Sequence, residues 1–342
     1  MTQKLKVLFL PNEIHTERVF TADALERLHR QFEVTRLASG ACDCTSEQVA
    51  EAIPGFAALV TGWGTPPLTR DVFERADALR IIAHSAGTVK RMLLDCAQEY
   101  VIPRGICVYS ANRAIAYNVA EHTIGFMILM MRRILDHAAM VRDNPGQWPE
   151  RMSRPNAQYL TGATVGLVSA SEVGRMVIRL LQPFDTRIRV FDPYLTDEDA
   201  AALNVTKAEL MEVFTESDIV SVHAPLLPET RSMIDGRHFR ALRDGAVFIN
   251  TSRGGVLDEE ALIAELATGR ISAALDVTTL EPLPAASPLL SLSNVIVTPH
   301  LAGSGYYGYS RIGDGAVRAL EDFFAGRAVQ GAVDFSRYAR IA

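Results

Sequence analysis

Three segments in the second half of the chain place an arginine, a glutamate and a histidine shortly after an apolar run. Arg253 stands in NTSRGG, Glu281 in LDVTTLEP and His300 in TPHLAG. An arginine fork can hold a substrate carboxylate and polarise the adjacent ketone, and a histidine can give a proton to the oxygen as hydride arrives. A glutamate hydrogen-bonded to the imidazole stabilises its protonated form. The three side chains therefore predict reduction of a carbonyl next to a carboxylate.

A strand-to-helix turn earlier in the chain has the spacing of a dinucleotide-binding loop. An apolar run over 164–168 leads into Ser169-Ala-Ser171-Glu-Val-Gly174, and a helical pattern continues to Leu181. In G-x-G-x-x-G the glycines make the tight turn, let the backbone approach pyrophosphate, and let helix and strand pack closely. Only the third glycine is present here. A serine at positive φ costs about 1–2 kcal/mol, although serine hydroxyls and helix N-terminal N–H groups can still hold a phosphate.

An aspartate at the end of the next strand supports a nucleotide site. Asp192 lies close to the distance from Gly174 at which an acid grips the adenosine ribose hydroxyls. Pro193 and Tyr194 follow it rather than an arginine, which favours NAD over NADP. Two alternatives stay open at this point: Asp192 as a turn residue before proline, and the serine loop as an ordinary strand-to-helix turn.

Runs typical of strands alternate with helical segments along the chain. The first series covers 6–10, 32–37, 57–60, 80–83 and 106–109; the second covers 165–168, 189–191, 219–222, 246–249, 272–275 and 295–297. This alternation predicts an α/β protein with two doubly wound parallel-sheet domains. The helical stretch 305–325 has no place left in the second sheet, so we expect it to return to the first domain.

Two segments connect the predicted domains. Residues 114–135 form a long stretch that is apolar on most sides, as expected of a helix between domains or subunits; a core helix is the alternative. Residues 144–156, with three prolines and Trp148, are typical of a surface connection.

Composition narrows the class of protein. The 342 residues carry a formal net charge of -6, which gives no reason to expect nucleic acid or an anionic membrane as a partner. The longest apolar stretch, 124–131, is far shorter than the ~20 residues of a membrane span. The first residues lack a signal-peptide core. We expect a cytoplasmic protein whose four cysteines (Cys42, Cys44, Cys96, Cys107) are free thiols rather than metal ligands.

Several motifs in order resemble the D-isomer-specific 2-hydroxyacid dehydrogenase family over nearly the whole chain. They are Ser85-Ala-Gly87-Thr88, Val119-Ala-Glu-His-Thr at the expected start of the long helix, the nucleotide turn, His223-Ala-Pro-Leu with Pro228-Glu-Thr230, and finally the three segments described first.

The resemblance implies roles for individual residues. Arg253 would bind substrate, Glu281 would pair with the histidine, and His300 would be the acid/base that contacts substrate and cofactor. The amides of the loop Ser85, Ala86 and Gly87 would bind the substrate carboxylate, and Asp276 would hold the nicotinamide carboxamide. The remaining cofactor contacts would be Thr88, Ser171, Glu172, Val173, Gly174, Asp192, Ala224, Pro225, Thr230, Thr251 and Ser252; no metal is implied.

The resemblance also implies an architecture. A flavodoxin-like substrate domain (1–112 and 303–342) would surround an inserted Rossmann-type NAD-binding domain (113–302). A homodimer would form through the helix 114–135. The sequence departs from the family at Ser169 and Ser171, and after Thr88, where Val-Lys-Arg replaces the usual Gly-x-Asp-Asn.

Two functions from different classes fit these patterns. One is an NAD-dependent 2-oxoacid reductase of the glyoxylate- or hydroxypyruvate-reductase kind, and the other is a nucleotide-sensing, corepressor-like protein with little turnover. A formate-dehydrogenase-like function is disfavoured, because that branch has glutamine in place of Glu281.

Among the other histidines, His122 is expected to anchor the start of the long helix. For His223, a structural role and a place in the nucleotide pocket both stay open. Surface or capping roles are expected for His15, His29, His84, His137 and His238.

Overall fold

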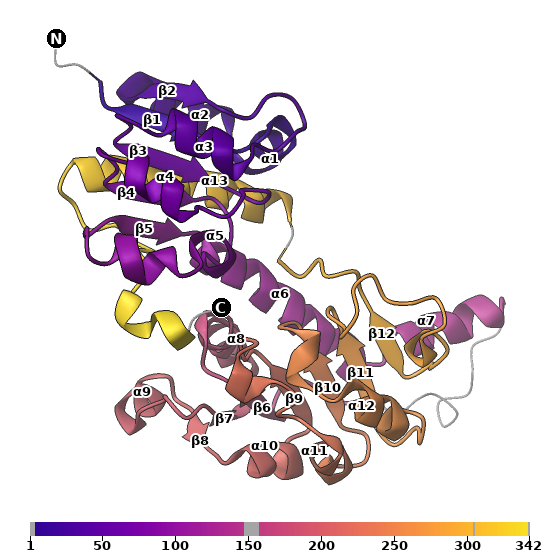
Figure 1. The fold of residues 1–342 in the computed structure, drawn as a ribbon. Helices are drawn as coiled ribbons and strands as arrows, with labels where there is room; N and C mark the ends of the chain where they lie inside the picture. The colour runs from indigo at the N-terminus through magenta and orange to yellow at the C-terminus, as the bar shows by residue number, and fades with distance from the viewer. Residues whose placement is uncertain (1–3, 147–156, 304, 341–342) are drawn as a thin grey trace. The chain divides into compact units, whose positions relative to one another are not determined.

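The chain forms two compact units, shown in Figure 1. The computed structural model describes residues 4–146, 157–303 and 305–340. Unit 1 comprises Met1–Ala116 and Ser304–Ala342, and unit 2 comprises Tyr117–Gly303. The family resemblance predicts domain boundaries between 112 and 113 and between 302 and 303. Part of the expected surface connection, 147–156, lies outside the described residues.

Unit 1 is built on a five-stranded parallel sheet with the order β2-β1-β3-β4-β5. Its strands are short and mostly buried, as in sheets covered on both faces. They are β1 Lys6–Phe9, β2 Glu33–Arg36, β3 Ala58–Thr61, β4 Ile81–His84 and β5 Cys107–Ser110. This is the flavodoxin-like strand order.

Helices cover both faces of this sheet. Polar side chains cap three of them, since Asn12, Thr21 and Thr45 each accept a hydrogen bond from a first-turn N–H. The helices are α1 Glu13–Val19, α2 Ala22–Gln31, α3 Ser46–Ala52, α4 Arg70–Arg75, α5 Lys90–Leu93, the π-helix Ala97–Val101, α13 Tyr306–Phe324 and the 3₁₀-helix Phe335–Arg340.

The last long helix, α13, packs within unit 1 although it follows the final strand of unit 2. Ile312, Ala316 and Leu320 are buried in one core cluster with residues of α1 and α2. A side chain at Gly313 would overlap the carbonyl oxygen of Val19, so glycine permits the close approach of α13 to α1. The C-terminal segment therefore completes the core of unit 1.

Unit 2 is built on a seven-stranded parallel sheet with the order β12-β11-β10-β9-β6-β7-β8. The prediction of two parallel-sheet α/β domains is therefore confirmed. The strands are β6 Thr164–Val168, β7 Arg187–Phe191, β8 Thr206–Lys207, β9 Ile219–Val222, β10 Val247–Asn250, β11 Ser272–Leu275 and β12 Val295–Val297. The sequence pattern missed β8, because its two exposed residues carry no apolar signal.

Two helical layers enclose the sheet of unit 2. One apolar cluster lies under α6 and α8, and a second lies under α10, α11 and α12. The helices are α6 Asn112–Met131, α7 Ile134–Asp143, α8 Glu172–Leu181, α9 Asp197–Ala202, α10 Leu210–Glu216, α11 Gly236–Ala241 and α12 Glu259–Leu266, with 3₁₀ turns at Gln182–Phe184, Pro228–Thr230, Gly254–Val256 and Pro288–Leu290.

The prediction of a single long helix over 114–135 is wrong at its C-terminal end. The helix α6 stops at Met131, and Arg133 adopts a left-handed conformation with φ of 47° before α7 begins. His122 lies in the middle of α6 rather than at its start, and its ring packs edge-on against Phe126. By length and composition α6 could span a membrane, yet Met127 and Met131 are buried in the core of unit 2. Core packing accounts for part of that apolar character, since 39% of the apolar window is buried.

Candidate active site

The three candidate catalytic residues of unit 2 follow neighbouring strands. Arg253 comes after β10, Glu281 after β11 and His300 after β12, and the sheet order places these strands side by side. Since parallel strands share one carboxyl edge, the three residues emerge at the same edge of the sheet, where ligands of such sheets bind.

Glu281 and His300 form a hydrogen-bonded pair. Nδ1 of His300 lies 2.7 Å from Oε2 of Glu281, and the N–H of Thr278 donates to the other carboxylate oxygen at 3.3 Å. The glutamate is thus held from both sides. Nε2 of His300 has no hydrogen-bond partner among the residues that the structure describes, so this nitrogen can meet a substrate oxygen.

The backbone around His300 is held by Asp276. Oδ1 of this aspartate accepts from Thr298 Oγ1 at 2.5 Å and from the N–H of Leu301 at 2.9 Å, and Oδ2 accepts from the N–H of Ala302 at 2.8 Å. His300 itself has φ of 51° and donates its N–H to the carbonyl of Asp276 at 2.9 Å. The buried carboxylate therefore fixes the loop that carries the histidine. Binding of the nicotinamide carboxamide by Asp276 stays a prediction.

Arg253 lies on a loop that a buried asparagine shapes. Asn250 donates to the carbonyl of Arg253 at 3.1 Å and accepts from the N–H and hydroxyl of Ser252. The exposed guanidinium donates to the carbonyl of Ser252 at 2.7 Å and contacts neither Glu281 nor His300 within the described residues. It is available to an anion.

Gly254 brings the arginine loop against the glutamate loop. A side chain at this glycine would overlap the backbone carbonyl of Thr278, three residues before Glu281. Glycine is therefore required at this position by the close approach of two backbones.

The nucleotide turn uses its two serines in different ways. Ser169 takes a left-handed conformation with φ of 85°, at the position of the first glycine of the motif. Ser171 has ordinary backbone angles and is the N-cap of α8: its Oγ accepts from the N–H of Gly174 at 3.3 Å and donates to the carbonyl of His223 at 2.8 Å. A side chain at Gly174 would overlap the carbonyl of Ser169, which explains why this glycine alone is kept.

Asp192 is tied directly to this turn. Its Oδ2 accepts from the hydroxyl of Ser169 at 3.1 Å and the N–H of Ala170 at 2.8 Å, and its Oδ1 accepts from the N–H of Tyr194 at 2.8 Å. The acid and the turn therefore form one rigid group at the carboxyl ends of β6 and β7.

The turn offers donors that fit a phosphate. Among the described residues, the N–H groups of Ser171, Glu172 and Val173 have no acceptor, and all three open the first turn of α8. Free N–H groups and the helix dipole make such a terminus an anion site. The residues present therefore fit the pyrophosphate of a dinucleotide.

The other cofactor candidates shape two neighbouring loops. Thr230 donates to the carbonyl of Pro225 at 2.6 Å and accepts from Leu227, which fixes the segment after Ala224. Thr251 Oγ1 lies 2.9 Å from Thr123 Oγ1 on α6. The side chain of Thr230 therefore holds the backbone over 225–227, and that of Thr251 contacts helix α6.

His223, in the same motif, is buried beneath the turn. Burial lowers the pKa of its ring to about 3, and neither ring nitrogen has a partner among the described residues. The ring is therefore neutral at neutral pH. Its Cβ lies near the backbone of Gly174, so His223 is part of the floor under the nucleotide turn.

The candidate substrate loop of unit 1 is held through its carbonyl groups. The carbonyl of Ala86 accepts from the N–H of Ala111, and that of Gly87 accepts from Ser110 Oγ at 2.6 Å. The N–H groups of Ala86 and Gly87 have no acceptor within the described residues. A side chain at Gly87 would lie 3.2 Å from Asn112 Oδ1, so the loop is closely packed. Thr88 follows and accepts a hydrogen bond from the N–H of Lys90.

The surface role expected for His15 and His84 is wrong. Both are buried, and burial lowers the pKa of each ring to about 4. His84 Nδ1 lies 2.8 Å from Thr61 Oγ1, and His15 Nε2 lies 2.9 Å from Ser85 Oγ. No spacing in the sequence links residue 15 with residue 85, so only the fold shows this contact. His238 is also buried, but it takes the expected capping role at the start of α11.

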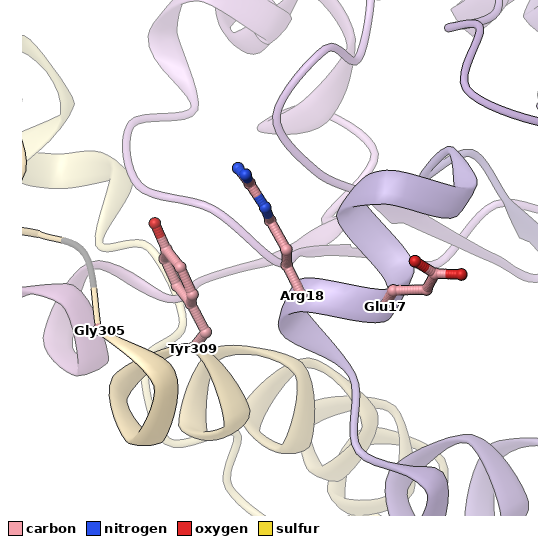
Figure 2. Close-up of a pocket in the computed structure, with 4 residues that line it drawn as sticks. All are labelled: Glu17, Arg18, Gly305 and Tyr309. Atoms are coloured by element: carbon pink, nitrogen blue, oxygen red, sulfur yellow. The ribbon is translucent and has the colours of Figure 1, made fainter.

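A pocket of about 420 Å³ lies in unit 1 and was not expected from the sequence. Glu17, Arg18, Gly305 and Tyr309 line it; in Figure 2, Arg18 and Tyr309 project in the same direction, while Glu17 points away from both. The ring centroid of Tyr309 lies 5.6 Å from that of Trp63, and the ring centroid of Trp63 lies 5.3 Å from that of His15.

Within the described residues, no group of three or more His, Cys, Asp or Glu could hold a metal ion.

The fold and the edge of unit 2 define an α/β chain with a unit of the dinucleotide-binding type. Residues 124–302 match the family model described as D-isomer specific 2-hydroxyacid dehydrogenase, NAD binding domain. The chain belongs to the D-isomer specific 2-hydroxyacid dehydrogenase family, and NAD is its cofactor.

Relatives with known names support this membership. The chain is 34% identical to a D-3-phosphoglycerate dehydrogenase from Methanocaldococcus jannaschii over 82% of its own length and 52% of that protein. It is 32% identical to a hydroxypyruvate reductase from Thermotoga maritima, over 78% of the chain and 84% of that protein. A phosphoglycerate oxidoreductase structure from Rhizobium etli has a TM-score of 0.81 at 26% identity, covering 96% of this chain and 98% of that one. The chain thus spans about half the length of the phosphoglycerate dehydrogenase it matches.

Proposed function

We propose that the protein is an NAD-dependent 2-hydroxyacid dehydrogenase that acts as a 2-oxoacid reductase. The observation that carries the proposal is the hydrogen bond between Glu281 and His300 at 2.7 Å, on the strand edge that also presents Arg253. The imidazolium that this carboxylate stabilises is the proton donor that carbonyl reduction requires.

Each residue has a defined task in this reaction. His300 Nε2 gives its proton to the carbonyl oxygen while C2 receives hydride, and the imidazole is left neutral beside Glu281. The guanidinium of Arg253 holds the substrate carboxylate and polarises the carbonyl. The family resemblance assigns the N–H groups of Ala86 and Gly87 as further donors for the substrate carboxylate. In the opposite direction, neutral His300 takes the proton from the hydroxyl group of the 2-hydroxy acid.

The cofactor's site is formed by the turn and acid described above. NADH supplies the hydride when bound, and NAD accepts it in the reverse reaction. The free N–H groups at the start of α8 bind the pyrophosphate, and Asp192 binds the adenosine ribose. Ser169 and Ala170 hold Asp192 ready for this contact.

We propose a glyoxylate- or hydroxypyruvate-reductase-like substrate range. The support is the match to the Thermotoga hydroxypyruvate reductase, at 32% identity over 78% of this chain. We also propose a cytoplasmic homodimer in which the apolar segment of α6 and the start of α7 contact a second copy. Leu135, on α7, is exposed and apolar, as such a contact requires. Size-exclusion chromatography with light scattering tests the dimer, and cell fractionation tests the location.

The decisive experiment is NADH oxidation by the purified protein with glyoxylate, hydroxypyruvate, phosphohydroxypyruvate, pyruvate and phenylpyruvate, together with an NADH-binding titration. Oxidation with hydroxypyruvate or glyoxylate, lost in His300→Ala, is the expected result. NADH binding without oxidation of any of these acids would overturn the proposal and leave the nucleotide-sensing function. Preference for phosphohydroxypyruvate would overturn the substrate range only.

A further inference from the structure

The ring of His15 connects helix α1 to the candidate substrate loop. The N–H of His15 donates to the side chain of Asn12, the N-cap of α1, so the residue is fixed in the helix's first turn. Its ring then reaches Ser85, the first residue after β4, at 2.9 Å. Both side chains are buried.

The direction of this hydrogen bond follows from the second bond of the serine. Ser85 Oγ lies 2.7 Å from the carbonyl oxygen of Thr61, which can only accept. The hydroxyl hydrogen is therefore used there, and His15 Nε2 must carry the hydrogen of the other bond. Burial lowers the pKa of His15 to about 4, so the ring is neutral, with its hydrogen on Nε2.

Gly62 leaves the space that the ring occupies. A Cβ at this position would lie 2.5 Å from Nε2 and 2.6 Å from Cε1 of His15. Its φ is not left-handed, so the backbone tolerates alanine, and the three nearest atoms that the methyl group would meet all belong to the ring of His15. Glycine at the end of β3 and histidine on α1 are therefore complementary in shape.

We propose that His15 is a positioning residue for the substrate carboxylate. By donating to Ser85, it holds the start of the loop whose free N–H groups, at Ala86 and Gly87, bind that carboxylate under the proposed function. The other end of the loop is held by Ser110 and Ala111. At its start, the N–H and hydroxyl of Ser85 both donate to the carbonyl of Thr61, and the bond from His15 is the third contact that fixes the serine. Loss of the contact weakens carboxylate binding and leaves the proton-transfer group untouched.

Three variants test the proposal. His15→Phe keeps a ring but removes the donor, Gly62→Ala displaces the ring, and His15→Gln restores a donor near the position of Nε2. We expect His15→Phe and Gly62→Ala to raise the KM for the 2-oxo acid about tenfold with kcat changed less than about twofold, and His15→Gln to recover most of the loss. His29→Phe, the same substitution at an exposed position of unit 1, is the matched control and keeps the wild-type KM.

A second readout does not depend on turnover. Amide hydrogen exchange in peptides covering residues 81–93 increases in His15→Phe and Gly62→Ala, and returns toward the wild-type rate in His15→Gln. Faster exchange in a protein that reduces no 2-oxo acid would support His15 as the loop's anchor while removing the proposed function. Unchanged exchange and unchanged KM in His15→Phe would overturn the inference, as would an equal fall in kcat and kcat/KM.

Discussion

The carboxylate of Glu281 lies 2.7 Å from Nδ1 of His300, and the two side chains remain 39% and 47% exposed. The two side chains are thus hydrogen-bonded to each other and still accessible from outside the protein. The neighbouring backbone holds it on both sides, through Thr278 on the glutamate and Asp276 on the histidine loop. Its geometry is set by the protein rather than by the substrate.

The first prediction concerns proton transfer. His300→Ala lowers kcat by roughly two to four orders of magnitude, the usual scale for a lost general acid, while the Kd for NADH stays unchanged. Glu281→Gln retains a hydrogen bond to Nδ1 but removes the negative charge, so kcat falls less than in His300→Ala. Steady-state kinetics and an NADH titration measure both. Glu198→Gln, on an exposed turn of α9, serves as the control; wild-type turnover in His300→Ala would remove this residue from the mechanism.

The second prediction concerns the close approach at Gly254. Gly254→Ala forces the arginine loop away from the carbonyl of Thr278, so we expect a fall in kcat/KM of about a hundredfold or more. Gly255→Ala is the matched control, because the nearest atoms that its new methyl group would meet are the flexible side-chain ends of Leu226 and Arg231. Equal kinetics in the two variants would show that the contact does not position Arg253.

Much of the fold and one group of site residues were predictable from sequence. The strands of both sheets are short apolar runs between helical segments, and Arg253, Glu281 and His300 follow three of these runs directly. Because neighbouring parallel strands share one edge, local pattern and position along the chain were enough to bring them together.

Other features depend on contacts that local sequence does not record. His15 follows an ordinary N-cap, and its burial arises only when the ends of β3 and β4 pack against α1. The end of α6 was misplaced because the apolar pattern continues to Leu135, whereas the chain turns at Arg133, whose side chain pairs with Asp136 at 2.6 Å. Ser171 replaces a glycine in the motif, but its hydroxyl caps α8, which the motif alone could not show.

The third prediction separates the cap from the phosphate site. Ser171→Ala removes the N-cap of α8 and lowers the free energy of unfolding by about 1 kcal/mol. The first turn of α8 then frays, so NADH binds more weakly, by about three- to tenfold. Thr21→Ala removes the cap of α2 in unit 1 and is the control. We expect it to lower stability by a similar amount and to leave the affinity for NADH unchanged. Unchanged NADH binding in Ser171→Ala would exclude a role for the cap in cofactor binding.

The fourth prediction concerns the attachment of α13. Arg27 on α2 contacts Asp314 at 2.5 Å and Glu321 at 2.6 Å, and its side chain is only 18% exposed. Arg27→Met leaves both carboxylates without this partner, and we expect the free energy of unfolding to fall by about 2 kcal/mol in urea titrations. Arg30→Met is the control, because Arg30 is exposed and its nearest carboxylate is 4.0 Å away. An equal effect of the two substitutions would contradict a specific contribution of Arg27.

The fifth prediction is the pH dependence of stability. Burial lowers the pKa of His15 and His84 to about 4 and that of His223 to about 3, from 6.5 for an exposed histidine. Between these values the unfolded chain binds protons that the folded chain does not. The stabilising contribution is therefore complete above pH 6.5 and is lost as the pH falls toward 4, by up to about 1.4 kcal/mol per pH unit for each histidine.

His223→Leu isolates one of these three contributions. Both ring nitrogens of His223 are buried without a described partner, so leucine removes a proton-binding group without breaking a hydrogen bond. We expect the variant to be at least as stable as the wild type near pH 7 in urea titrations, and to lose stability less steeply between pH 6.5 and 4, by about one proton. His29→Leu, at an exposed position, keeps the wild-type slope. An unchanged slope in His223→Leu would mean that the folded protein protonates His223 as readily as the unfolded chain does.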